Sequence, residues 1–285
     1  MRILVFGRVG QLGSALAELL PAHHEVTFLD RPQVDLSQPE SVPGLITEHA
    51  PELVINSAAY TAVDKAESEP ALAQLINADG PAAMAQSCRA RDIPLIHYST
   101  DYVFDGTAST PYLEDAAVAP ASVYGRTKLA GEQAVAQETG RHIILRTAWL
   151  YSHVGHNFLK TMLRVASEGK PLRVVDDQMG SPTFAWDLAT ASVAAVAALE
   201  KGRDDVYGIF HATNSGVTSW HGFAQKIFEL AGVKKADLSP IPTEAYPTPA
   251  PRPAYSVLNC DRLEQVFQVR LPDWREALSR CVACL

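Results

Sequence analysis

The sequence predicts an α/β fold, with a Rossmann-type, doubly wound parallel sheet and a smaller C-terminal lobe. Apolar runs of strand length alternate with helix-length segments through residue 146, the pattern that places helices on both faces of a parallel sheet. A glycine-rich turn joins the first predicted strand to the first helix. Beyond residue 149 the alternation loosens, which indicates a separate lobe over residues 150–285.

Composition restricts the partners of the protein. The 285 residues suffice for one large domain with a smaller lobe, and the apolar fraction of 47% is ordinary for a globular protein. The net charge of -8 argues against nucleic acid or an anionic membrane as a main partner. No run approaches the ~18 apolar residues of a membrane span, and the chain opens on a strand rather than on a signal sequence. We therefore expect a cytoplasmic protein.

The cysteines predict neither a disulfide framework nor a metal site. Cys88, Cys260, Cys281 and Cys284 are few and unevenly spaced. The last two have a metal-ligand spacing, but no second ligand pair accompanies them, and residues three apart on a helix share a face. We expect no metal.

The first strand, Arg2 to Phe6, runs into a glycine turn before a helix from about Leu12 to Leu20. Gly7, Gly10 and Gly13 recur at a spacing of three. Glycine there allows a sharp turn, close approach of a pyrophosphate and tight packing of helix on strand. The helix N-terminus then offers amide donors to phosphates. This turn predicts a dinucleotide site, and residues 1–149 are predicted to form an NAD(P)-binding domain.

The second strand, Glu25 to Leu29, ends in Asp30-Arg31. An acidic residue there commonly binds the adenine ribose hydroxyls, whereas an arginine can bind a 2′-phosphate. Both together indicate NADPH, or use of NADH as well, although Arg31 could equally be a solvated loop charge. Asp35 and Leu36 follow in the next loop and could border the adenine.

The central strands are followed by small and polar side chains. Leu53 to Ile55 is a third strand, and the small residues after it would let a flat cofactor lie against the backbone. A helix from about residue 71 to 91 leads to a strand at Leu95 to Tyr98, and another strand spans Ile143 to Leu145.

Thr100, Tyr124 and Lys128 form the candidate catalytic group. Thr100 follows a buried strand, and Ser122 is a good N-cap for a helix on which Tyr124 and Lys128, four residues apart, share a face. The pKa of a phenol is ~10, so a tyrosine needs a nearby cation to exchange protons at neutral pH. The Thr100 hydroxyl could hold a carbonyl oxygen that gains charge during hydride transfer. Alone, this spacing is also common on ordinary surface helices.

The C-terminal part is predicted to complete a cleft over the cofactor and to cross back to the sheet. A proline-rich stretch, residues 240–253, is expected to be extended rather than regular. The other expected elements are helices near residues 157–167, 186–199, 219–231 and from 273 onward, strands at 172–175 and 207–211, and a turn-rich loop at 176–183.

With these motifs in hand, the chain resembles the extended short-chain dehydrogenase/reductases, and among them the dTDP-4-dehydrorhamnose reductase family. The resemblance covers nearly the whole chain. The matching phrases are Asn56 to Pro70 (NSAAYTAVDKAESEP), Tyr98 to Phe104 (YSTDYVF), Tyr124 to Glu132 (YGRTKLAGE), Asn157 to Arg164 (NFLKTMLR) and Tyr246 to Asn259 (YPTPAPRPAYSVLN).

The resemblance implies reduction of the 4-keto group of dTDP-4-dehydro-L-rhamnose to dTDP-L-rhamnose by NADPH or NADH. Tyr124 would donate the proton, and Lys128 would bind the nicotinamide ribose. Thr100, Asp101 and Trp149 would contact the sugar; Arg252 could bind the diphosphate or be a structural ion pair. The implied cofactor contacts are Gly10, Gln11 and Leu12 for the pyrophosphate, Asp30 for the ribose, Asp35 and Leu36 for the adenine side, and Ala59, Tyr60 and Thr61 for the middle.

Two features depart from the family. Some members form a magnesium-linked dimer through carboxylates at positions that are Ala15 and Trp186 here, so we expect a monomer or a metal-free homodimer. His153 and His156 exceed the expected histidine content of their loop and are interpreted as loop residues rather than metal ligands.

Two other functions remain open. The same fold serves a non-catalytic, cofactor-binding regulatory subunit, against which the intact Thr100, Tyr124 and Lys128 count. Nucleotide-sugar epimerases and dehydratases share the same three residues. A dehydratase usually carries Asp-Glu after the threonine, whereas Asp101-Tyr102 follows here.

Overall fold

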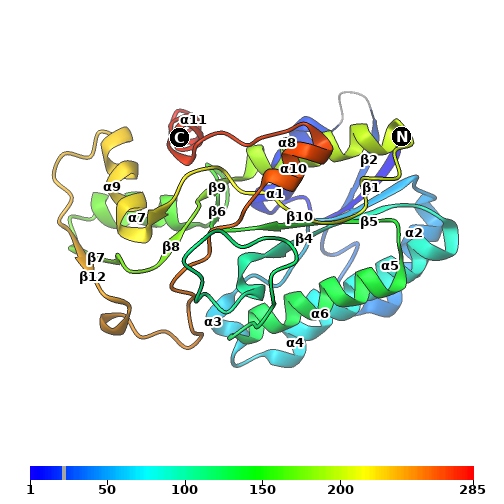
Figure 1. Cartoon of the computed structure of the whole chain (residues 1–285), viewed down its shortest axis with the longest axis horizontal. Coiled ribbons are helices and arrows are strands. Elements are labelled where there is room, and N and C mark those ends of the chain that lie inside the picture. The colour runs from blue at the N-terminus through cyan, green and yellow to red at the C-terminus, as the bar shows by residue number, and fades with distance from the viewer. Residues whose placement is uncertain (21–23) are drawn as a thin grey trace.

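The computed structural model describes residues 1–20 and 24–285, and within them six parallel strands form one central sheet. The strand order is β10-β5-β4-β3-β1-β2 (Figure 1). The bounds are Arg2–Phe6 for β1, Glu25–Leu29 for β2, Leu53–Asn56 for β3, Leu95–Thr100 for β4, His142–Thr147 for β5 and Gly208–His211 for β10. The predicted α/β, doubly wound architecture is confirmed.

Helices cover both faces of this sheet (Figure 1). One face packs against α1 (Gln11–Leu19) and α8 (Ala185–Glu200), with α10 (Asp261–Phe267) beside α8. The other face packs against α2 (Val42–His49) and α5 (Gly80–Arg91), with α6 (Val123–Glu138) against α5. The central residues of β1, β3 and β5 are apolar and buried, as expected for a sheet covered on both sides.

The order of the strands reverses between β1 and β3. The chain leaves β1 for β2 on one side of it and then returns to place β3 on the other side. In open parallel sheets, ligands bind at such a switch point, beside the carboxyl ends of the strands. The segments after β1, β3, β4 and β5 therefore meet at one edge of the sheet.

The C-terminal lobe stands beside this edge, at the left of Figure 1. Its two-stranded sheet pairs β7 (Leu172–Val175) with β12 (Leu238–Ile241). Around one apolar cluster lie α7 (Phe158–Ser167), α9 (Trp220–Leu230) and α11 (Trp274–Val282). Between these lobe segments the chain returns to the central sheet through α8 and β10.

Some elements differ from the sequence expectation. The helix expected over 71–91 is divided into α4 (Pro70–Gln74), a π-helical turn (Leu75–Asp79) and α5. The proline-rich stretch is not wholly irregular, because Pro240 and Ile241 pair with β7 through their place in β12. None of the described helices is long and apolar enough to cross a membrane.

Candidate functional site

The glycine turn after β1 has three glycines with different structural requirements. Gly7 has φ of 95°, which favours glycine. A Cβ at Gly13 would lie 2.3 Å from the carbonyl oxygen of Gly7, so α1 can approach the turn only because Gly13 lacks one. A Cβ at Gly10 would meet no described atom within 4 Å. The fold does not need glycine at residue 10, but a ligand approaching the backbone there would.

Asp30, which was expected to bind the ribose of the cofactor, forms hydrogen bonds within the protein. At the end of β2, its Oδ2 accepts hydrogen bonds from the backbone amides of Arg8 (2.8 Å) and Val9 (2.9 Å). The carboxylate thereby holds the glycine turn in place.

The loop after Asp30 contains the other expected adenine contacts. Arg31 Nη2 lies 3.2 Å from Asp35 Oδ1, and both side chains are exposed, so the pair is weak and Arg31 can reorient. Hydrogen bonds from Ser37 hold the pKa of Asp35 below its usual value. The side chain of Leu36 is buried in the core and packs against Gly80, which anchors the loop to the core.

A buried asparagine that the sequence analysis missed fixes the loop after β3. Asn77, in the π-helical turn, accepts from the Tyr60 amide at 2.8 Å and donates to the Tyr60 carbonyl at 3.1 Å. Its amide also lies 3.1 Å from the Thr127 hydroxyl on α6. One side chain therefore connects the Ala59-Tyr60-Thr61 loop to the helix that carries Tyr124 and Lys128.

The three candidate catalytic residues meet at the carboxyl edge of β4. Ser122 caps α6, its Oγ accepting from the Gly125 amide at 3.1 Å, as the sequence predicts. Lys128 is buried and donates to the carbonyl oxygen of Tyr98 at 2.6 Å. Thr100, the last residue of β4, donates to Asp101 Oδ1 at 2.9 Å.

Burial governs the protonation of this group. It raises the pKa of Tyr124 to about 12, with the Thr100 hydroxyl acting in the opposite direction. Burial lowers the pKa of Lys128 to about 8, although the negative charge of Glu132 acts to raise it. Burial raises the pKa of Asp101 to about 6, although hydrogen bonds from Ser256 and Thr100 act to lower it. At neutral pH the Tyr124 phenol and the buried Lys128 amine are therefore both protonated.

A second residue that the sequence analysis missed lies behind Lys128. His97, fully buried on β4, has its Nδ1 3.1 Å from Asn56 Nδ2 and its Nε2 3.5 Å from Lys128 Nζ. The side-chain oxygen of Asn56, Oδ1, accepts from the Ala58 backbone amide, so the side-chain nitrogen, Nδ2, donates to His97. Burial and the adjacent Lys128 hold the pKa of His97 well below its usual value, so this imidazole is neutral.

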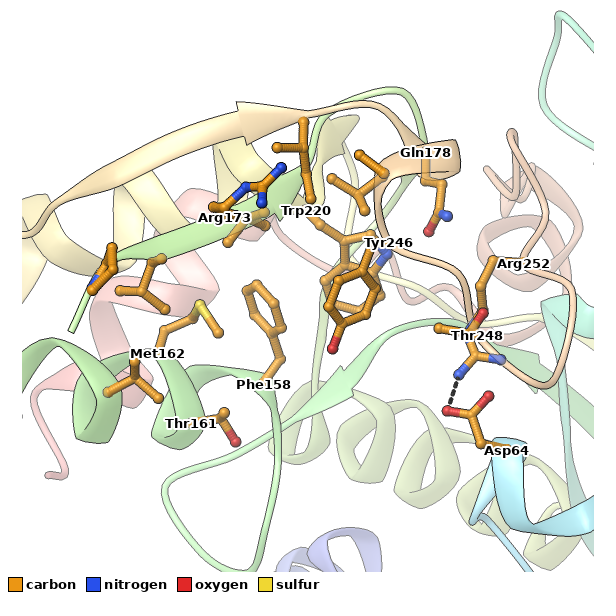
Figure 2. Close-up of a pocket in the computed structure, with 17 residues that line it drawn as sticks. Asp64, Phe158, Thr161, Met162, Arg173, Gln178, Trp220, Tyr246, Thr248 and Arg252 are labelled. Carbon is orange, nitrogen blue, oxygen red and sulfur yellow. Dashed lines mark hydrogen bonds and ion pairs between the residues drawn. The ribbon is translucent and has the colours of Figure 1, made fainter.

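A cavity of about 680 Å³ lies in the lobe, beside the sheet edge (Figure 2). Its lining combines apolar and aromatic side chains with arginine, glutamine and threonine side chains (Figure 2). At one end of the cavity, Arg252 Nη2 pairs with Asp64 Oδ2 at 2.8 Å. The ring of Tyr102 packs edge-on against that of Tyr124, with ring centroids 5.5 Å apart, and burial raises the pKa of Tyr102, with the charge of Arg252 acting in the opposite direction.

Trp149 follows β5 with φ of 48°, a left-handed conformation that is rare for a large side chain. One face of its indole is stacked on Trp220, with ring centroids 3.6 Å apart and planes 7° apart. Contact with a sugar is therefore left to the remaining surface of the ring.

The departures from the family are visible in the structure. Ala15 is buried against the sheet, and Trp186 donates from Nε1 to Glu18 at 2.9 Å. His153 packs against Trp186 with ring centroids 4.4 Å apart. Within residues 1–20 and 24–285, no group of three or more histidine, cysteine, aspartate or glutamate side chains is arranged to hold a metal ion.

Comparison with known proteins places the chain in a family. The family model for the RmlD substrate binding domain matches residues 1–285. A dTDP-4-dehydrorhamnose reductase of Sinorhizobium fredii is 46% identical, over 100% of this chain and 98% of the relative. Two crystal structures of dTDP-4-dehydrorhamnose reductases each match 100% of this chain, over 99% of the chain in the crystal structure. The Clostridium acetobutylicum enzyme is 39% identical, with a TM-score of 0.94. The Bacillus anthracis enzyme, in complex with NADP, is 36% identical, with a TM-score of 0.92. The chain belongs to the dTDP-4-dehydrorhamnose reductase family.

Proposed function

We propose that this protein is an NAD(P)H-dependent oxidoreductase that reduces the 4-keto group of dTDP-4-dehydro-L-rhamnose to dTDP-L-rhamnose. NADPH is the proposed hydride donor, and NADH a possible second one. The observation that carries the proposal is the meeting of Thr100, Tyr124 and Lys128 at the carboxyl edge of β4, with a protonated phenol at neutral pH. Full-length relatives named for this reaction support it.

The residues after β1 fit a dinucleotide. Gly10 leaves open space beside the N-terminus of α1, whose first turn carries no acidic side chain and no side-chain cap. The free amides there attract phosphate. We assign the pyrophosphate to the turn that contains Gly7, Gly10, Gln11, Leu12 and Gly13.

The rest of the cofactor would extend along the sheet edge. Asp30 Oδ1 would bind the adenine ribose, and Arg31 a 2′-phosphate. Asp35 and the backbone at Leu36 would border the adenine, while Ala59, Tyr60 and Thr61 would line the middle of the cofactor. The B. anthracis relative in complex with NADP supports this assignment of cofactor.

The bound nicotinamide supplies the hydride for C4 of the sugar, and this chain supplies the proton. Tyr124 gives its phenol proton to the carbonyl oxygen as that oxygen gains charge, so the C=O bond becomes CH–OH. The Lys128 ammonium stabilises the phenolate that remains, which then regains a proton from solvent. The Thr100 hydroxyl holds the carbonyl oxygen beside Tyr124.

The substrate would extend from this edge into the lobe. Asp101 and Trp149 adjoin the sugar, and Arg252 at the end of the cavity binds the diphosphate. We further propose that residues 1–149 bind the cofactor and 150–285 mainly the substrate. The protein is proposed to act in the cytoplasm as a monomer or a metal-free homodimer.

The proposal is tested by loss of the reduced-nicotinamide absorbance with purified protein, NADPH and dTDP-4-dehydro-L-rhamnose made in situ. We expect oxidation of NADPH that depends on the sugar nucleotide. Tyr124→Phe should lower turnover by about 100-fold or more, because it removes the proton donor, while NADPH binding stays intact. A folded protein that binds NADPH but never oxidises it would contradict the proposal and favour the regulatory alternative.

A further inference from the structure

Trp220 connects the lobe cavity to the sheet edge. It is the first residue of α9, which Ser219 caps by accepting from the Gly222 amide at 3.0 Å. Its indole lines the cavity beside Phe158, with ring centroids 4.7 Å apart (Figure 2). The stacking contact with Trp149 brings the same side chain against the residue that follows β5. One indole therefore contacts both the cavity wall and Trp149.

The conformation of Trp149 requires support from its surroundings. A large side chain at φ of 48° costs free energy and persists only where neighbouring groups hold it. Gly180 approaches the same indole so closely that a Cβ added to it would lie 2.4 Å from Trp149 Cε2.

A short β-ribbon sets the position of both neighbours. Gly180 in β8 (Met179–Gly180) pairs with Thr218 in β11 (Thr218–Ser219), and Trp220 follows directly. Met179 of the same ribbon exchanges backbone hydrogen bonds with residues 254 and 256, just beyond Arg252. The ribbon therefore places Gly180 and Trp220 around Trp149 and connects them to the segment that ends the cavity.

We infer that Trp220 is a positioning residue for the nucleotide sugar: it holds Trp149 against the sugar and forms the wall on which the nucleotide end of the ligand lies. This inference rests on the proposed function. An apolar cavity with an aromatic wall and an arginine at one end suits a nucleoside diphosphate. The stack makes the placement of Trp149 depend on Trp220.

Kinetics of single and double variants test this role. Trp220→Leu should raise the KM for the sugar nucleotide about fivefold to tenfold, the value of one aromatic pair, and leave the KM for NADPH within about twofold of wild type. Trp220→Phe should recover part of the loss. Trp220 acts through Trp149, so the effects of replacing the two residues should not add. In the double variant Trp149→Phe/Trp220→Phe, the increase in the KM for the sugar nucleotide, expressed as a free energy, should be smaller than the sum of the increases in the two single variants.

Trp186→Phe is the matched control, since Trp186 lies on α8 and does not line the cavity. It should leave both KM values unchanged. Equal losses of sugar-nucleotide and NADPH affinity in Trp220→Leu, or strict additivity in the double variant, would overturn the inference.

Calorimetric titration with dTDP separates this inference from the proposed reaction, because binding does not require turnover. Trp220→Leu should weaken dTDP binding about fivefold or more. If the wild-type protein binds dTDP, loses that binding without Trp220, and never oxidises NADPH, then the inference stands and the proposed reaction is wrong. Wild-type protein that binds no dTDP, or binds it equally well without Trp220, would defeat the inference.

Discussion

Burial of the Lys128 side chain opposes stability. This side chain is 3% exposed, and burial lowers its pKa from 10.5 to about 8. Below about pH 8 the folded and unfolded states both carry the ammonium, so the folded state bears the whole cost of burying it. Between about 8 and 10.5 the folded state has lost the proton while the unfolded state keeps it, so this cost disappears as the pH rises.

Replacing Lys128 by methionine should therefore stabilise the protein while abolishing its activity. We expect the free energy of unfolding near neutral pH to rise by about 1–3 kcal/mol, since the buried charge is removed but the Tyr98 carbonyl loses a donor. The advantage over wild type should shrink between about pH 8 and about pH 10. Urea unfolding of both proteins across this range measures it. An advantage independent of pH would show that another effect of the substitution dominates.

At this scale the sequence predicted residues whose chemistry is local. The Ser122 cap was predicted and is confirmed, and Tyr124 and Lys128 were predicted to share a helix face because they are four apart. Asn77 and His97 could not be identified, because their partners, Tyr60 and Lys128, lie 17 and 31 residues away in the chain. The bonds from Asp30 to the glycine turn likewise depend on a contact across two strands.

Among the elements, the junction of β1 and α1 offers a matched pair of glycine substitutions. Gly13→Ala should destabilise the protein by about 2 kcal/mol or more, because its Cβ would meet the backbone oxygens of Gly7 and Arg8 at 2.3 and 2.7 Å. Gly10→Ala should change stability by about 1 kcal/mol or less, yet weaken NADPH binding about tenfold, because its Cβ would project into the proposed pyrophosphate site. Thermal unfolding and NADPH titration of both variants measure this. Unchanged NADPH binding by Gly10→Ala would contradict the assignment of Gly10 to the pyrophosphate site.

Element prediction succeeded where the pattern was long and apolar. All six strands of the central sheet were predicted within about two residues at each end. Three short helices were missed: α2 contains a proline and a glycine, α3 has only four residues, and α10 has only seven. The π-helical turn was missed because its extra residue leaves the helical pattern continuous.

At the scale of the whole molecule, the cavity joins segments that are distant in the chain. Its lining comes from α3 (Val63–Ala66), α7, β7, α9 and residues 241–252. No local pattern predicts that these segments meet. The sequence could place Arg252 near the substrate only through the family resemblance, and left open whether it binds ligand or pairs structurally.

Arg252 and Asp64 allow these two roles to be separated. Arg252→Met should raise the KM for the sugar nucleotide about tenfold or more if the guanidinium binds the diphosphate. Asp64→Asn removes the same ion pair but keeps the arginine, so it should leave that KM within about twofold of wild type. Steady-state kinetics of both variants decide between the roles. Equal increases in KM would mean that Arg252 serves only as a structural partner of Asp64.

The most direct test of the account follows the hydride itself. Protein, dTDP-4-dehydro-L-rhamnose and NADPH deuterated at its transferable position are incubated, and the sugar nucleotide is analysed by NMR and mass spectrometry. The account predicts one deuterium at C4 of dTDP-L-rhamnose for each NADPH oxidised. Conversion of the sugar nucleotide without net oxidation of NADPH, as in an epimerase, or oxidation that leaves no deuterium at C4, would contradict it.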